Sequence, residues 1–116
     1  RVRMITPEGR VTTLAGTGEP GYRDGPARSA EFDVPIGIGV DAQGYVCVAD
    51  TGAHRIRRIS PDGVVSTIAG SGNAGYIDGP AAGAEFWYPT DIAIGPNGNL
   101  YVADWKNHRI RIIISP

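Results

Sequence analysis

The chain has 116 residues, which is room for one modest domain, and its charges nearly cancel, with 11 Lys and Arg against 12 Asp and Glu. This balance gives no support to a general attraction for nucleic acid or anionic membranes, and the longest apolar stretches fall far short of the roughly 20 residues that a membrane-spanning helix needs. The 17 glycines follow no three-residue period, so they mark turns rather than a collagen-like helix.

Short apolar runs rich in Val, Ile and Tyr predict β-strands along the whole chain, since none of them has helical spacing. In chain order, the predicted strands cover residues 1–5, 11–15, 36–40, 45–49, 55–59, 64–69, 92–94, 100–103 and 109–113. Gly, Pro, Asn and Asp stand in the short connections, which favours hairpins between consecutive strands. The sequence therefore predicts an all-β fold of antiparallel meanders.

The same pattern occurs twice, with a period of 54 residues. Residues 1–62 align on residues 55–116 without insertion or deletion, and almost half of the aligned positions are identical. The chain thus holds strands three and four of one unit at 1–15, a complete unit at 36–69 and a partial unit at 90–114. Four short strands per repeat are typical of a β-propeller blade of roughly 40–45 residues, and a long connection between units accounts for the longer period.

The long connection between units is expected to pack over the blades. Asp24 and Asp78 each precede Gly-Pro, where we expect a turn or a helix cap rather than a cation site. A short helical turn is predicted after each of them. Phe32 and Phe86, further along, are predicted to fill the apolar space between neighbouring sheets.

A motif at the turn between strands two and three recurs in both units. It reads Val48-Ala49-Asp50 followed by His54-Arg55-Ile56, and Val102-Ala103-Asp104 followed by Asn107-His108-Arg109-Ile110. In this motif, and over essentially the whole chain, the sequence resembles the NHL-repeat family, although the first unit has Ala53 where the second has Asn107. The resemblance implies blades of a β-propeller, commonly six in number, and a function mainly in protein or RNA interaction.

The polar residues of this motif are interpreted as structural rather than catalytic. They are Asp50, His54, Arg55, Asp104, His108 and Arg109. In each unit the Asp and the Arg flank the same short loop, so we expect the carboxylate and the guanidinium to face each other across the strand pair. The two histidines stand at strand three, away from a propeller axis, so the sequence predicts no metal site and no cofactor.

The sequence carries no signature of catalysis, because it lacks a nucleophile elbow, a phosphate-binding loop and zinc-spaced cysteines. The single cysteine, Cys47, lies within a predicted strand and is interpreted as a buried, unreactive thiol. A basic stripe is interpreted as paired or packed structural arginines, so nucleic acid is not an expected partner. The members of this stripe are Arg55, Arg57, Arg58, Arg109 and Arg111.

The candidate binding site consists of Trp87, Tyr88, Trp105, Lys106 and Asn107. In a propeller, the long connections and the loops between strands two and three emerge on the same face, so these residues are expected to gather there. The first unit has no aromatic residue at the equivalent positions, so the repeat itself does not require them. Such a cluster is typical of a protein or small-molecule interface, and packing of Trp87 and Tyr88 against the next blade is an equally open alternative.

A blade buries both of its faces, so two units leave two faces without a neighbour. Three chains of two blades would make six, and we predict a homotrimer with cyclic symmetry that serves as a non-catalytic binding scaffold. One blade would then take strands one to three from one chain and strand four from the next. The alternative is a fragment of a larger propeller that is a lyase, a hydrolase or an RNA-binding protein. The opening Arg1 is expected of an excised or processed chain, and no compartment is indicated.

Overall fold

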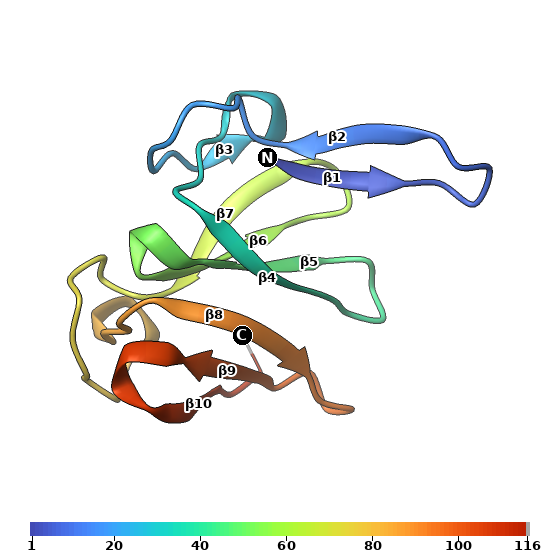
Figure 1. Cartoon of the computed structure of the whole chain (residues 1–116). Coiled ribbons are helices and arrows are strands. Elements are labelled where there is room, and N and C mark those ends of the chain that lie inside the picture. The colour runs from blue at the N-terminus through green and yellow to red at the C-terminus, as the bar shows by residue number, and fades with distance from the viewer. Residues whose placement is uncertain (116) are drawn as a thin grey trace.

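The computed structural model describes residues 1–115, which form three antiparallel β-sheets lying side by side (Figure 1). The strands are β1 (Val2–Ile5), β2 (Val11–Ala15), β3 (Gly25–Pro26), β4 (Pro35–Val40), β5 (Val46–Asp50), β6 (Arg55–Ile59), β7 (Val64–Ala69), β8 (Pro89–Ile94), β9 (Leu100–Asp104) and β10 (Arg109–Ile113). Short 3-10 helices stand in the connections: η1 (Ala27–Ser29), η2 (Thr51–Ala53), η3 (Ala81–Gly83) and η4 (Trp105–Asn107). The all-β prediction is confirmed, with small shifts of the strand ends.

The middle sheet is a complete four-stranded blade with one added strand. Its order is β4, β5, β6, β7 and then β3, so the four strands of the repeat form the predicted meander. The added strand β3 comes from the long connection and pairs with β7 through Gly25 opposite Val65 and Pro26 opposite Val64. The sequence analysis did not predict β3. Its pairing fastens the connection to the outer edge of the next blade.

The first and third sheets are parts of the same design. The first contains β1 and β2, which are strands three and four of their unit, and the third contains β8, β9 and β10, which are strands one to three. Hairpin turns follow the expected chemistry: the carboxylate of Asp41 accepts hydrogen bonds from the backbone of Gln43 and Tyr45, both at 2.9 Å. Gly44 closes that turn with a φ of +88°, which glycine adopts without strain.

The inner strands β4 and β8 approach each other closely. A Cβ atom added to Gly37 would lie 2.5 Å from the carbonyl oxygen of Thr90, so only glycine fits at this point. Gly39, two residues along the same face, lies against the side chain of Ile94. The two glycines of β4 therefore set the distance between the middle and third blades where they meet.

Each interface between blades has an apolar core. One core joins the middle and third blades: Cys47, Ala49, Ile56, Ala69, Ala84, Phe86, Ile92, Leu100, Val102 and Ile113. The other joins the first and middle blades: Val2, Ala15, Ala30, Phe32, Val48, Ile59 and Val65. Phe32 and Phe86 are 4% and 2% exposed, which confirms that they fill the space between sheets. Cys47 and Ala49 of β5 belong to the one core and Val48 between them to the other, so the middle blade packs against a neighbour on each of its faces.

Two apolar faces remain exposed within residues 1–115. Their side chains, each at least 50% exposed, are Ile36, Ile38 and Val40 on β4, and Ile110, Ile112 and Ile114 on and just after β10. The first face lies beside β1 and β2, which cover the outer strands of the middle blade but not β4. Among the described residues there is no helix that is both long and apolar enough to cross a membrane.

Candidate binding surface

Backbone hydrogen bonds hold two loops together at the end of the third blade. The N–H of Lys106 donates to the carbonyl oxygen of Trp87 at 3.0 Å, and the N–H of Trp105 donates to that of Tyr88 at 3.3 Å. The carboxylate of Asp104, at the end of β9, accepts a further bond from the N–H of Trp87 at 2.9 Å. The end of the long connection and η4 therefore lie side by side, as the sequence analysis expected.

The aromatic side chains on these loops form an exposed group. The rings of Tyr88 and Trp105 have their centroids 6.2 Å apart and are tilted by 50°. The Nζ atom of Lys106 lies 4.8 Å from the centroid of the Trp105 ring, within reach of a cation–π interaction. Trp87 is 41% exposed, Tyr88 36% and Trp105 57%, so these rings keep a large part of their surface open among the described residues.

His54, from the middle blade, completes this group. Its ring centroid lies 4.6 Å from that of Tyr88, and its Nδ1 atom accepts a hydrogen bond from the backbone N–H of Tyr88 at 3.1 Å. We call His54, Trp87, Tyr88, Trp105 and Lys106 the aromatic surface. The sequence analysis placed His54 in the structural motif and missed this contact. The contact joins two blades, so no local sequence signal could have revealed it.

His54 and Tyr88 both have left-handed backbone conformations, with φ of +55°. The equivalent residues in the other unit, His108 and Val34, have φ of +54°, so the repeat imposes this conformation whatever the residue type. Partial burial lowers the pKa of His54, and Asp104 and Asp33 act against that effect. The neutral imidazole is the form that accepts the hydrogen bond from Tyr88.

Asn107, also predicted for the binding site, lies beneath the aromatic surface. It is only 9% exposed, and its amide donates to the carboxylate of Asp104 and to the carbonyl oxygen of Gly75, both at 2.7 Å. These bonds tie η4 to the long connection. Asn107 therefore supports the loops from below, while in the middle blade Ala53 stands in its place.

The ion pair of the repeat motif differs from the expected one. Asp50 and Arg55 are opposite each other in the register of β5 and β6, but Asp50 binds Arg57 instead, at 2.7 Å. In the third blade Asp104 binds Arg111 at 2.8 Å in the same way. The reason is position: Arg57 lies inside the blade and is fully buried, whereas the side chain of Arg55 reaches outward to the long connection.

The long connection wraps around each buried arginine. Arg57 donates to the carboxylate of Asp24 at 2.8 Å and to the carbonyl oxygens of Glu31 and Arg23 at 2.8 and 2.9 Å. Its guanidinium also lies 4.8 Å from the ring centroid of Phe32. Asp24 is therefore a partner of a buried arginine, not the turn residue or helix cap that the sequence predicted, and Asp78 has the same role toward Arg111.

The remaining arginines of the basic stripe are engaged as well. Arg55 lies 3.7 Å from the ring centroid of Tyr22 and donates to the carbonyl oxygen of Ser71 at 3.0 Å. Arg109 lies 4.0 Å from the ring centroid of Tyr76. Four arginines of the stripe thus bind the long connections to the blades, and Arg58 lies 4.7 Å from the ring centroid of Tyr45 within the middle blade. These contacts agree with the interpretation of the stripe as structural.

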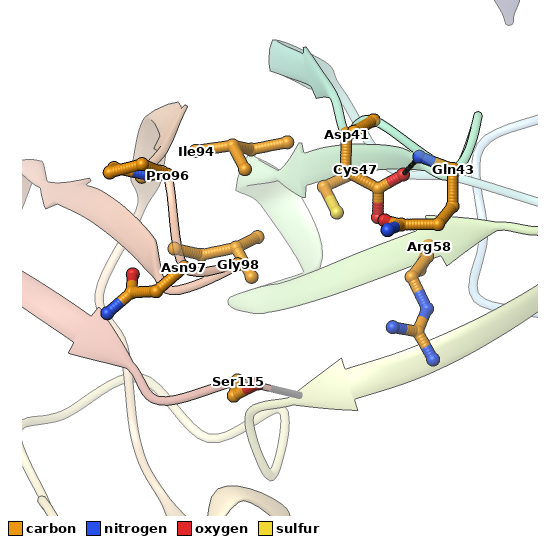
Figure 2. Close-up of a pocket in the computed structure, with 12 residues that line it drawn as sticks. Asp41, Gln43, Cys47, Arg58, Ile94, Pro96, Asn97, Gly98 and Ser115 are labelled. Carbon is orange, nitrogen blue, oxygen red and sulfur yellow. Dashed lines mark hydrogen bonds between the residues drawn. The ribbon is translucent and has the colours of Figure 1, made fainter.

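A hollow of about 390 Å³ lies at the opposite end of the strands from the aromatic surface, between the hairpin turns of the middle and third blades (Figure 2). Asp41, Cys47 and Arg58 stand on one side of it, and Pro96 and Asn97 on the other. Burial raises the pKa of the Cys47 thiol to about 11, with Arg58 opposing and Asp41 adding to this effect. The thiol is therefore protonated at neutral pH, as expected of an unreactive cysteine.

Within the described residues, no three His, Cys, Asp or Glu side chains gather as a metal site would require. Every buried side-chain nitrogen or oxygen in the same part of the chain has a hydrogen-bond partner. The polar residues of the repeat thus satisfy one another.

Meandering four-stranded blades that pack face to face define the class of the protein as a β-propeller. The sequence pattern of the NHL repeat matches residues 32–59 and 86–113. The chain belongs to the NHL-repeat family.

Two relatives illustrate the range of proteins that contain such blades. The chain is 36% identical over 94 residues to Protein SUPPRESSOR OF QUENCHING 1, chloroplastic, of Arabidopsis thaliana. This match covers 80% of the present chain and 9% of the Arabidopsis protein. The chain is 35% identical over 80 residues to the probable peptidyl-alpha-hydroxyglycine alpha-amidating lyase pgal-1 of Caenorhabditis elegans, covering 68% of this chain and 22% of that one. The chain thus spans only a small part of the length of these relatives.

Solved structures show the same fold. A structural genomics protein of unknown function from Bacteroides thetaiotaomicron matches with a TM-score of 0.88 and 32% identity, over 95% of this chain and 28% of that one. An auxiliary nutrient binding protein from the same organism matches with a TM-score of 0.78 and 27% identity, over 90% and 29% of the two chains.

Proposed function

We propose that the chain is part of a non-catalytic β-propeller scaffold that binds a protein or small-molecule ligand through the aromatic surface. The observation that carries this proposal is the exposure of Trp87, Tyr88 and Trp105 on loops that backbone hydrogen bonds hold in place. Rigid aromatic side chains supply a large contact area at a low cost in conformational entropy. Lys106 beside them adds a positive charge, so a ligand with a flat apolar face and an acidic group fits best.

Comparison of the two units supports a role beyond packing. The positions of Trp87 and Tyr88 are occupied by Asp33 and Val34 in the first unit, and Trp105 is replaced by Thr51. The blades nevertheless have the same backbone at these points. The aromatic residues are therefore not needed to form a blade, and the similarity to an auxiliary nutrient binding protein is consistent with a binding role.

Intrinsic fluorescence tests this proposal, because the chain has two tryptophans and both lie in the aromatic surface. Two probes represent the ligand classes. Cellohexaose is a neutral sugar, and its binding is measured by tryptophan fluorescence. The blocked peptide Glu-Trp-Glu is an acidic aromatic peptide, and its binding is measured by the shifts of the backbone amide resonances of the chain, because the peptide itself fluoresces. We expect at least one probe to bind saturably. Trp105→Ala should weaken that binding by about tenfold, as truncation of a central aromatic residue commonly does.

Tyr101→Ala is the matched control, because Tyr101 is also an exposed aromatic residue, 41% accessible, but lies on β9 away from η4. This control should bind the probe as the unchanged chain does. Failure of both probes to bind saturably, or equal weakening by the two substitutions, would contradict the assignment of the aromatic surface.

A second candidate function is catalytic and comes from the similarity to the lyase pgal-1. On this alternative the chain is a fragment of a larger NHL-type propeller with lyase activity, and its own blades carry reacting groups of the enzyme. A peptide ending in α-hydroxyglycine distinguishes the two candidates. We expect the 116-residue chain to leave it intact, whereas release of the amidated peptide and glyoxylate above the uncatalysed rate would favour the enzyme.

We further infer that the chain works within a closed ring of blades. The exposed isoleucines and the valine on β4 and β10 form apolar faces of the kind that blades cover with their neighbours. Three copies of the chain, each contributing two blades, would close a ring of six. Closure of the ring would remove both exposed faces at once.

A further inference from the structure

A slot runs along the outer edge of β10 in the third blade. It is a cavity of about 620 Å³ between β10 on one side and the long connection at Tyr76, Asp78 and Gly79 on the other, with Phe86 beneath. β10 pairs with β9 on its inner side, and within the described residues no strand pairs with its outer side. We call this cavity the strand slot.

The middle blade shows what such a slot contains when it is filled. There β7 lies between β6 and β3, the counterparts of β10 and of the connection at Gly79–Pro80. The hydroxyl of Thr67, on β7, donates to the carboxylate of Asp24 at 2.9 Å and lies 2.7 Å from the hydroxyl of Tyr22. These contacts recognise a strand with a threonine at its centre.

In the third blade the same recognition groups are present without that strand. The hydroxyl of Tyr76 donates to the carboxylate of Asp78 at 3.0 Å, as Tyr22 does to Asp24. Arg111 holds the other carboxylate oxygen of Asp78 at 2.8 Å. The side chain of Asp78 is 68% exposed, against 36% for Asp24, because in the described residues no threonine hydroxyl covers it.

We propose that the strand slot binds β2 of a second copy of this chain. β2 reads Val-Thr-Thr-Leu-Ala and aligns with the Val-Ser-Thr-Ile-Ala of β7, so Thr13 takes the place of Thr67. Its hydroxyl would donate to Asp78. Val11, half exposed within one chain, would join the core that contains Phe86, as its counterpart Val65 joins the core that contains Phe32. This inference deepens the proposed ring, because it names the two surfaces that join one copy to the next.

β2 can pair with β10 of a second copy because β1, its partner within the chain, is weakly held. β1 and β2 form a two-stranded sheet, a unit that is marginally stable alone, and three of the four residues of β1 are exposed. β10 has the same place in the repeat as β1. Arg111, on β10, is anchored by Asp78 and Asp104, whereas its counterpart Arg3 is exposed.

The exchange therefore replaces β1 by β10 at the edge of β2 and completes a four-stranded blade. It also adds the connection at Gly79 to the other edge of β2, in the way that β3 pairs with β7. Strand pairing is kept, since one antiparallel neighbour replaces another. Ile110 would occupy the position of Val2 against the middle blade of the second copy, which covers one of the exposed apolar faces.

A synthetic peptide with the sequence of residues 6–16 tests the slot directly. We expect it to bind the 116-residue chain with one peptide per chain, measured by calorimetry, and to lower the mass of the self-associated particle in sedimentation velocity. A Thr13→Val peptide should bind about tenfold more weakly, since a hydrogen bond to a charged group is lost. A Thr12→Val peptide is the matched control and should bind normally, because its counterpart Ser66 is exposed and makes no bond to Asp24.

The outcomes separate the slot from the ring. A self-associated particle whose mass does not respond to the peptide overturns the slot but leaves the proposed ring intact. A chain that binds the peptide yet stays monomeric at every concentration overturns the second copy as the occupant. Equal affinity of the Thr13→Val and unchanged peptides overturns recognition through Asp78.

Discussion

One buried arginine, Arg57 in the middle blade and Arg111 in the third, binds the long connection to each of these two blades. Arg57 has no exposed surface, yet its guanidinium is surrounded by the carboxylates of Asp50 and Asp24 and by carbonyl oxygens of the long connection. A buried guanidinium costs several kcal/mol unless its hydrogen bonds are satisfied, so the connection must adopt this path. The same arginine that stabilises the blade therefore also fixes the conformation of the connection.

Asp50→Ala is predicted to lower the free energy of unfolding by about 3–5 kcal/mol, because it removes one partner of a fully buried ion pair. Urea denaturation followed by circular dichroism measures the loss. Arg3→Met serves as the control, since Arg3 is exposed, and it should change the stability by no more than about 0.5 kcal/mol. If both variants lose a similar amount of free energy of unfolding, the buried ion pair does not contribute more to stability than an exposed arginine does.

His54 is predicted to make the stability depend on pH. Burial lowers its pKa in the folded chain below the ordinary 6.5, so around that pH the unfolded chain binds more protons than the folded one. Its contribution to stability is therefore complete above about pH 6.5 and is lost as the pH falls from there through the folded pKa. Below that pKa the protonated ring no longer accepts the hydrogen bond from Tyr88.

Urea denaturation at pH 8 and at several lower pH values measures this effect. His54→Asn should reduce the pH dependence, because asparagine also tolerates the left-handed backbone but does not titrate. His108→Asn is the control: His108 has the same backbone conformation and is exposed, so its loss should leave the dependence in place. If the free energy of unfolding depends on pH in the same way in the unchanged chain and in His54→Asn, His54 is not the source of the pH dependence.

At the scale of single residues, the sequence analysis predicted correctly that the motif residues form structural contacts, but it did not predict which residues they contact. Asp50 was correctly expected to bind an arginine of the next strand, but the choice between Arg55 and Arg57 depends on where the long connection runs. That connection has no regular pattern from which its path could be derived. The contact of His54 with Tyr88 was missed for a related reason, because it depends on the packing of one blade on the next.

At the scale of the elements, regular alternation made the strands predictable. Nine of the strands coincide with apolar runs between turn residues, and only β3 was absent from the prediction. β3 has two residues, Gly25 and Pro26, and proline cannot donate to a sheet, so no local preference marks this strand. It exists because the anchoring of Arg57 brings the connection alongside β7.

The contact between β4 and β8 gives a prediction at the same scale. Gly37→Ala should destabilise the chain by about 1–3 kcal/mol, because the added methyl group would meet the backbone of Thr90 and Asp91, which lies within a strand and has little freedom to move. Gly83→Ala is the control, because a Cβ atom there meets nothing within 4 Å. Thermal unfolding should show a lowered midpoint for the first variant alone, and equal midpoints for both variants would refute the close approach of the inner strands.

At the scale of the whole molecule, the exposed apolar residues on β4 and β10 decide how the chain exists in solution. One face belongs to β4 of the middle blade and the other to β10 of the third, so a pair of copies that joined by one contact would still expose the others. Contacts between unlike faces repeat until a ring closes, and closure of a ring gives a definite size. In the proposed ring of six blades, two blades per chain would make that size three copies.

Light scattering across a dilution series is therefore predicted to give a stable mass near three times 12.2 kDa. Ile38→Glu places a charge on the β4 face, half exposed within one chain, and should shift the particle to 12.2 kDa while leaving the fold intact by circular dichroism. Val64→Glu is the control for added charge, because Val64 is similarly exposed, at 46%, but lies on β7 and belongs to neither apolar face. A folded monomer of the unchanged chain would overturn the ring of three copies, and the apolar faces would then be covered by further blades of one longer polypeptide.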